Sequence, residues 1–191
     1  MDVRPGALGT AAAIVALTGA SIAGLSAFPS CAPRTPEGTV RPFVREGRAG
    51  LIVVEGSEVF EGGEWLKHGP FVFRDELGEE ISRGRYVKGL EDGPWTQRYE
   101  DGSKGVGAFV NGEREGRWQT FHPNGKLQDT GAYQRGLRTG TWVSLRDDGT
   151  RLRSAEYVEG KKEGQVTWYL KDGTTVNRKR SGLYRNDKLV E

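Results

Sequence analysis

The segment that decides the fold is GRWQTFHPNG, residues 116–125, because the chain repeats it twice more in outline. The earlier copy is GPWTQRYEDG, residues 93–102, and the later copy is GTWVSLRDDG, residues 140–149. The tryptophans therefore recur at spacings of 23 and 24 residues, and a glycine follows each of them seven residues later. A fixed period of this length is typical of stacked repeat proteins, in which each copy packs mainly against its neighbours.

Each copy predicts two strands and two turns. In the fourth copy, residues 126–134 predict the first strand, a turn that holds Gly136 and Gly140 follows, and residues 141–146 predict the second strand. Asn-Gly or Asp-Gly recurs at 101–102, 124–125, 148–149 and 172–173, and predicts tight turns because glycine accepts positive φ without a Cβ clash. No helical period follows residue 40. We therefore expect an all-β fold, an elongated antiparallel β-meander of tandem hairpins of about 24 residues each.

The periodic part begins after two non-repetitive segments. We expect a signal peptide or membrane anchor at 1–30, a flexible linker at 31–48 and the β-repeat domain at 49–191. Residues 51–54 predict a capping strand ahead of the first copy. The expected copies are 60–83, 84–106, 107–130, 131–154 and 155–180, with a partial copy at 181–191.

Two aromatic positions and one glycine position recur in register. Residues at equal phase become neighbours along a sheet, where aromatic pairs stabilise and bury large areas. We interpret these positions as structural, although an exposed aromatic groove for glycan or peptide stays open as an alternative. The positions are Tyr86, Phe109, Tyr133 and Tyr157; Trp95, Trp118 and Trp142; and Gly102, Gly125, Gly149 and Gly173.

The N-terminal segment predicts export. Residues 6–28 carry no charge, as in a signal peptide or membrane anchor. Cys31, the only cysteine, cannot form an internal disulfide, and its position resembles the lipid-modified cysteine of bacterial lipoproteins. That resemblance implies cleavage before Cys31 and acylation there, while a cleaved soluble signal and an uncleaved anchor remain alternatives. We expect a bacterial-envelope protein, as a membrane-anchored lipoprotein or in periplasmic or secreted form. Prolines in 31–48 predict the flexible tether.

No motif points to catalysis or to a cofactor. His68 and His122 occupy different phases of the repeat, so no metal-ligand spacing arises. Each Asp-Gly turn offers too few oxygens for calcium, which needs six to eight. No nucleophile or phosphate-binding motif is present. We therefore expect no enzyme, no catalytic, metal or cofactor site and, at a net charge of +2, no nucleic-acid partner.

The grammar Gly-x-Tyr/Phe-x-x-Gly-x-x-x-Gly-x-Trp, followed by a turn glycine, resembles the MORN repeat in its bacterial variant form. The resemblance covers about residues 60–190. It implies an elongated, twisted antiparallel β-sheet. Eukaryotic members of the family have been linked to membrane phospholipids and to protein scaffolding, and bacterial variant members are often labelled as antitoxins.

These observations lead us to expect a non-enzymatic protein-interaction or scaffold module, exported to the bacterial envelope and lipid-tethered. Peripheral binding to anionic membrane lipid through basic loops, and antitoxin-like inhibition of a partner protein, are the alternatives. The partner is expected to be a protein that the sequence does not identify. The candidate contacts are the basic residues expected in loops: Arg114, Arg138, Lys161, Lys162, Arg178, Lys179 and Arg180.

Overall fold

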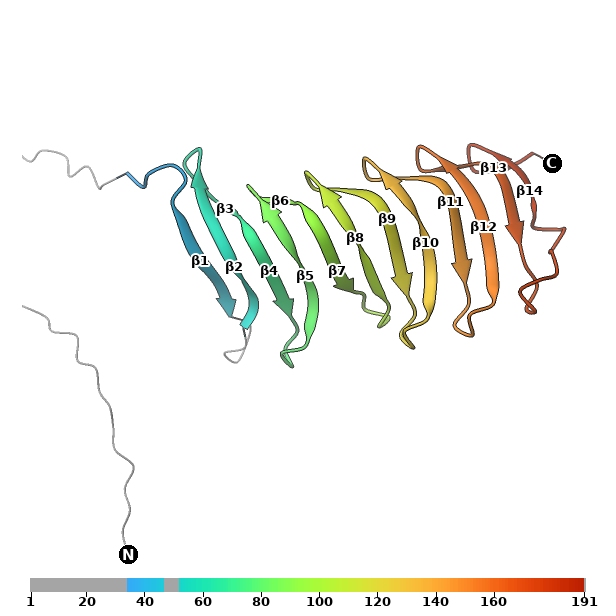
Figure 1. Cartoon of the computed structure of the whole chain (residues 1–191), viewed down its shortest axis with the longest axis horizontal. Helices are drawn as coiled ribbons and strands as arrows, with labels where there is room; N and C mark the ends of the chain where they lie inside the picture. The colour runs from blue at the N-terminus through green and yellow to red at the C-terminus, as the bar shows by residue number, and fades with distance from the viewer. Residues whose placement is uncertain (1–33, 47–51, 191) are drawn as a thin grey trace, which may run out of the picture. The chain divides into compact units, whose positions relative to one another are not determined.

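The computed structural model describes residues 34–46 and 52–190, and these residues form a single antiparallel sheet of fifteen strands (Figure 1). No described residue is helical. The sheet runs in chain order from β1 to β15, except that β3 pairs only with β2 and β6 only with β5. The expected all-β meander is thereby confirmed. The strands are β1 Val40–Glu46, β2 Ile52–Glu61, β3 Glu64–Lys67, β4 Gly69–Arg74, β5 Glu80–Val87, β6 Leu90–Glu91, β7 Gly93–Arg98, β8 Lys104–Val110, β9 Glu113–Phe121, β10 Leu127–Gln134, β11 Leu137–Leu145, β12 Arg151–Val158, β13 Lys161–Trp168, β14 Gly182–Arg185 and β15 Lys188–Leu189.

Two-residue turns close the hairpins along one edge of the sheet. In the turn between β10 and β11, Arg135 and Gly136 have φ values of 49° and 74°. Positive φ at both central positions is the type I′ geometry, whose twist matches that of the flanking strands. The Gly136 N–H donates a 2.9 Å hydrogen bond to the Arg114 carbonyl of the preceding copy. Each such turn is therefore fastened to its neighbour, as in the equivalent bonds from Gly89 to Lys67, Gly112 to Glu91 and Gly160 to Arg138.

The opposite edge carries the Asp-Gly and Asn-Gly turns that the sequence predicts. At the turn after β11, Gly149 has a φ of 93°, and Asp148 Oδ1 accepts hydrogen bonds from the N–H and hydroxyl of Thr150, both at 2.7 Å. A side chain that caps its own turn explains why aspartate precedes these glycines. The same bonds, with the hydroxyl first, hold the pKa of Asp148 below its ordinary value.

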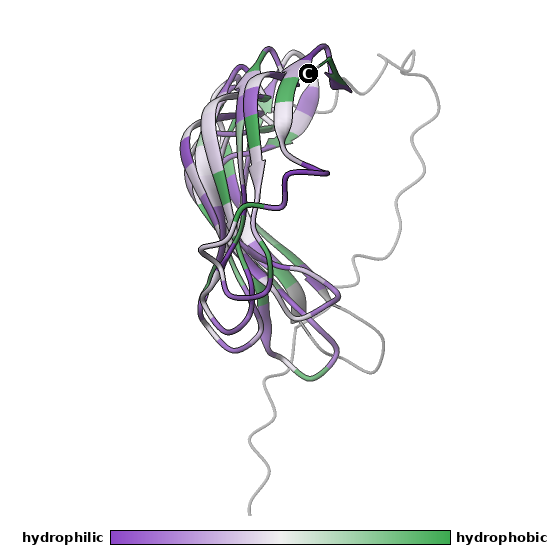
Figure 2. Cartoon of the chain, turned by 90° about the vertical axis from the view of Figure 1, so that its right-hand side faces the viewer, coloured by the Kyte–Doolittle hydropathy of each residue, from purple (hydrophilic) through white to green (hydrophobic). Residues whose placement is uncertain are grey.

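The core is an aromatic ladder on one face of the sheet. Trp118 and Trp142 are only 2 % exposed. Tyr133 meets both indoles edge-on, with ring centroids 6.0 Å from Trp118 and 5.1 Å from Trp142. Figure 2, which looks along the row of strands, shows that the strands are bent rather than flat. The buried rings support the structural interpretation of the ladder and remove the exposed groove at these positions.

Glycines without positive φ make room for the ladder. A Cβ atom on Gly131 would overlap the indole of Trp142, and Gly84 and Gly107 stand in the same relation to Trp95 and Trp118. In the fifth copy alanine replaces the glycine and valine the tryptophan. Ala155 and Val166 are register partners and are 1 % and 0 % exposed, respectively. The repeat therefore conserves the combined volume of each pair rather than either residue.

Two sequence-based boundaries are wrong. Gly140 lies inside β11 rather than in the turn, at a point where the register with β10 shifts. Its φ of 64° identifies a bulge, for which glycine is suited. The first copy begins at Gly56 rather than near residue 60, because the Cβ of Gly56 would lie 2.6 Å from the ring of Phe71. A longer β2–β3 hairpin shifts its phase relative to the other copies.

The segment expected to be a flexible linker, 31–48, contains strand β1. This strand pairs with β2 and is itself the edge of the sheet, so Pro42 is tolerated because an edge strand needs hydrogen bonds on one side only. Arg41 anchors it, with Nη2 2.8 Å from Glu58 Oε2 and its guanidinium 3.9 Å from the ring centroid of Trp65. The capping strand expected at 51–54 is instead, from Ile52 onward, the start of β2. Leu51, Cys31 and the signal segment lie outside the described residues.

Candidate interaction surface

The 23- and 24-residue period extends to a charged position that lies over the aromatic ladder. Arg138, in β11, places its guanidinium 4.3 Å from the Trp142 ring centroid. Arg114, in β9, is 4.5 Å from that of Trp118. Three of the expected loop contacts, Arg114, Arg138 and Lys162, therefore lie in strands, and all three are half-buried. A cation over an indole face is stabilised by the ring quadrupole, so these side chains also hold the fold together.

The environment of Arg138 favours its charged form. Burial by itself would lower its pKa, but the hydroxyls of Tyr133 and Tyr157 outweigh that effect and raise the pKa above its ordinary value. Arg138 is therefore a fixed cation enclosed by rings rather than a mobile surface charge.

The sequence analysis missed two members of this position, Lys67 and Glu91. Lys67 Nζ lies 4.8 Å from the ring centroid of Tyr86, whereas Glu91 Oε1 lies 3.5 Å from the Tyr86 hydroxyl. Burial first, and then the Glu91 carboxylate, raise the pKa of Tyr86 to about 12. Counting back 24 and 23 residues from Arg138 and Arg114 would have found both residues.

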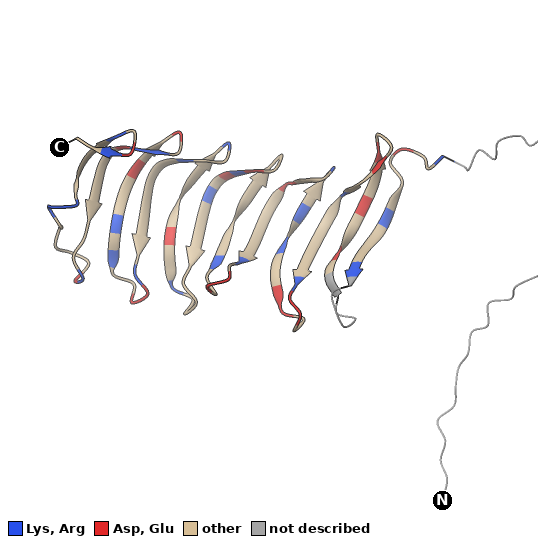
Figure 3. Ribbon diagram, turned by 180° about the vertical axis from the view of Figure 1, so that it is seen from behind, with Lys and Arg blue, Asp and Glu red and all other residues tan. Residues whose placement is uncertain are grey.

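The remaining predicted contacts are more exposed. Lys161 is exposed, and its Nζ donates a 3.1 Å hydrogen bond to Asn186 Oδ1. Arg178, Lys179 and Arg180 are exposed in the connection between β13 and β14. Arg180 nevertheless lies 3.8 Å from the ring centroid of Trp168. Figure 3 shows acidic and basic side chains interspersed along the sheet, so no single-sign face dominates.

The turn edge carries a second set of contacts between copies, made by the first residue of each type I′ turn. The Arg135 N–H donates to Glu115 Oε2 at 2.8 Å, and the Asn186 N–H donates to Glu163 Oε2 at 2.9 Å. In each case the carboxylate belongs to the preceding copy. Thr139 stands 24 residues after Glu115 and 24 before Glu163, at the same phase.

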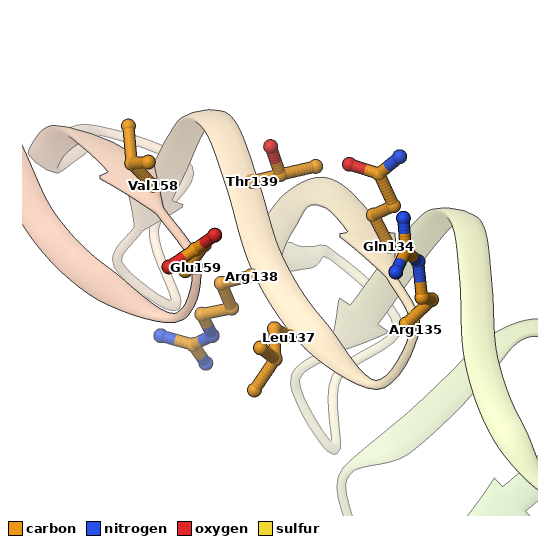
Figure 4. Close-up of a pocket in the computed structure, with 7 residues that line it drawn as sticks. All are labelled: Gln134, Arg135, Leu137, Arg138, Thr139, Val158 and Glu159. Carbon is orange, nitrogen blue, oxygen red and sulfur yellow. The ribbon is translucent and has the colours of Figure 1, made fainter.

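A cavity of about 310 Å³ lies where Thr139 replaces the glutamate. Within the part of the chain that the structure describes, no acceptor is present for the Glu159 N–H that corresponds to those of Arg135 and Asn186. Figure 4 shows Gln134 and Arg135 on one side of the cavity and Val158 and Glu159 on the other. Leu137, Arg138 and Thr139 lie between them.

Neither a metal centre nor a membrane-spanning helix occurs among residues 34–46 and 52–190. No group of three or more His, Cys, Asp and Glu side chains gathers there, and no helix is long and apolar enough to cross a bilayer. His122 instead links two copies, since its Nε2 lies 3.0 Å from the Leu145 carbonyl oxygen.

Comparison with known proteins does not identify the chain: no family model matches its sequence, and no curated protein matches it.

Proposed function

We propose that this chain is a non-enzymatic β-repeat interaction module, exported to the bacterial envelope and lipid-tethered through Cys31. We further propose that its repeats are of the MORN type. The observation that carries the proposal is the division of labour within each copy. Residues that recur in register are used by the fold itself, as rings, ring-facing glycines and turn caps. Residues that do not recur lie at the turn tips, evenly spaced along one edge.

The turn tips offer a varied chemical surface on a rigid frame. Their first positions are Lys88, Asn111, Arg135, Glu159 and Asn186, and all five are exposed. Each is held by type I′ geometry, and the following residue in each turn is hydrogen-bonded to the preceding copy. Binding groups on a fixed scaffold lose little entropy when a partner docks. An extended row of this kind suits a protein partner better than a small substrate.

Peripheral binding to anionic lipid is a second candidate because of one specific feature. Arg178 and Lys179 are exposed side by side, and within the described residues neither forms an ion pair. Exposed cations near an anionic surface contribute about 1 kcal/mol each and are screened by salt. Retention on anionic vesicles at high salt would count against this mode.

The proposed function is tested by crosslinking in the native envelope, followed by capture of the epitope-tagged full chain. Three forms are compared: the unaltered chain, Cys31→Ser, and the turn-tip variant Lys88→Glu/Arg135→Glu. We expect one specific protein with the unaltered chain and its loss with Cys31→Ser. The turn-tip variant should stay in the membrane fraction and lose the partner. Equal recovery of the partner with all three forms would refute both the tether and the turn-tip surface.

A further inference from the structure

We propose that the cavity between the hairpins β10–β11 and β12–β13 binds a carboxylate of a protein partner, together with an apolar side chain beside it. This inference deepens the proposed function by naming the chemistry of one contact. The identity of the natural partner rests on that function, whereas carboxylate binding can be measured independently of export or tethering.

The repeat itself supplies the argument for a carboxylate. In the third copy Glu115 accepts the Arg135 N–H, and in the fifth copy Glu163 accepts the Asn186 N–H. In the fourth copy Thr139 is too short to reach the equivalent Glu159 N–H, and the cavity lies there. A donor with no acceptor loses free energy once it is shielded from water. A carboxylate supplied from outside would restore the bond that the neighbouring copies make internally.

The second copy shows that the unused N–H alone does not make this site. Asp92 stands at the phase of Glu115, and no acceptor is present for the Asn111 N–H among the described residues. That copy nevertheless carries its own negative charge at this position, which opposes a second carboxylate. Only the fourth copy combines an uncharged residue at this phase with a lined cavity.

The lining of the cavity suits an acid flanked by an apolar group. Arg135 and Arg138 bring positive charge. Leu137 and Val158 are 48 % and 54 % exposed, which is unusual for apolar side chains in ordered strands and turns. The Glu159 carboxylate also lines the cavity and opposes a second negative charge there. Neutralising Glu159 should therefore strengthen binding, which gives the proposal a gain-of-function test.

The test uses the full chain in uncharged dodecyl maltoside micelles, with the backbone amide resonance of Glu159 as the readout. The probe is the peptide acetyl-Leu-Glu-amide, and the matched control is acetyl-Leu-Gln-amide, which differs only in replacing the carboxylate with a neutral amide. We expect a saturable shift with the acid and roughly tenfold weaker binding of the amide, since a charged acceptor adds over 1 kcal/mol. N-acetyl-leucine serves as a third probe, and tighter binding of it would indicate a chain-terminal rather than a side-chain carboxylate.

Three variants decide between a site and a general charge effect. Thr139→Glu should supply the missing carboxylate from within, so it should abolish the shift while the melting temperature stays equal or rises. Thr141→Glu adds the same charge on the same strand outside the cavity and should leave binding within twofold. Glu159→Gln should tighten binding of the acid. Equal shifts with both dipeptides, or binding that survives Thr139→Glu, would overturn the proposal; saturable binding without partner capture would overturn only the tethered function.

Discussion

Gly131→Ala tests the idea that each repeat conserves the combined volume of a glycine and a tryptophan. The new Cβ atom would overlap the Trp142 indole, which is 2 % exposed and cannot move into solvent without losing its burial. Alanine stabilises a strand by about 0.5–1 kcal/mol relative to glycine. Overpacking a well-filled core costs about 1–3 kcal/mol. We therefore expect Gly131→Ala to lower the free energy of unfolding by about 1–2 kcal/mol.

The second half of the prediction comes from the fifth copy, where Ala155 faces Val166 in register. Trp142→Val alone should cost about 3 kcal/mol, because it removes a buried indole and leaves a cavity. In that background Gly131→Ala partly fills the cavity, so its effect should fall to zero or become stabilising. The double-mutant cycle should then give a favourable coupling of about 2 kcal/mol between Gly131 and Trp142.

The assay is equilibrium urea denaturation of the full chain, followed by far-ultraviolet circular dichroism so that the loss of a tryptophan does not alter the probe. The matched control combines Gly131→Ala with Trp95→Val, which lies two copies away and should be additive to within about 0.5 kcal/mol. Additive effects in the Gly131–Trp142 cycle would refute the volume argument. They would mean that the glycine is needed for backbone conformation alone.

Three further changes probe other contacts. Trp118→Ala should destabilise the chain by about 3–5 kcal/mol, since the ring is 2 % exposed; an unchanged melting temperature would contradict its burial. Arg138→Met keeps the aliphatic packing but removes the cation 4.3 Å from the Trp142 ring centroid, so urea denaturation should show a loss of about 1 kcal/mol. The Thr175 hydroxyl first, and then backbone N–H groups, lower the pKa of Asp172 to about 2. Its carboxylate therefore stabilises the fold above its unfolded pKa of about 4 and loses that effect as the pH falls towards 2. Melting curves of Asp172→Asn should show a smaller pH dependence across that window, and an unchanged profile would contradict this role.

The sequence predicted the meander because its strongest signals are local and repeated. Trp95, Trp118 and Trp142 set the period, and the Asp-Gly turns set the hairpin ends. The role of Gly140 could not be predicted, because a glycine in a turn and a glycine in a bulge both need positive φ, and only the register of β10 against β11 distinguishes them. Composition misled at β1 for a related reason. Pro42 argues against a strand that is paired on both sides, and the sequence alone does not show which strand is the edge.

The basic residues were harder to assign than the fold, since charge in a sequence does not reveal what lies beneath it. Arg114 and Arg138 were expected at loop surfaces, yet they cover indole rings. Their spacing, equal to that of the tryptophans, already separated them from Arg178 and Lys179, which have no counterpart in the other copies. Periodicity in a charged position is therefore a better guide to a structural role than its charge is to a binding role.

The same logic explains why recognition should depend on departures from the repeat. A position that obeys the period must satisfy identical neighbours on both sides, so a substitution there disturbs the stacking of the copies. Thr139 breaks the pattern of Glu115 and Glu163 and leaves one donor and one cavity without harming the ring ladder beneath. A repeat array can thus acquire a binding site by omitting a contact that its other copies make, and the foldedness of Thr139→Glu separates that loss of function from any loss of structure.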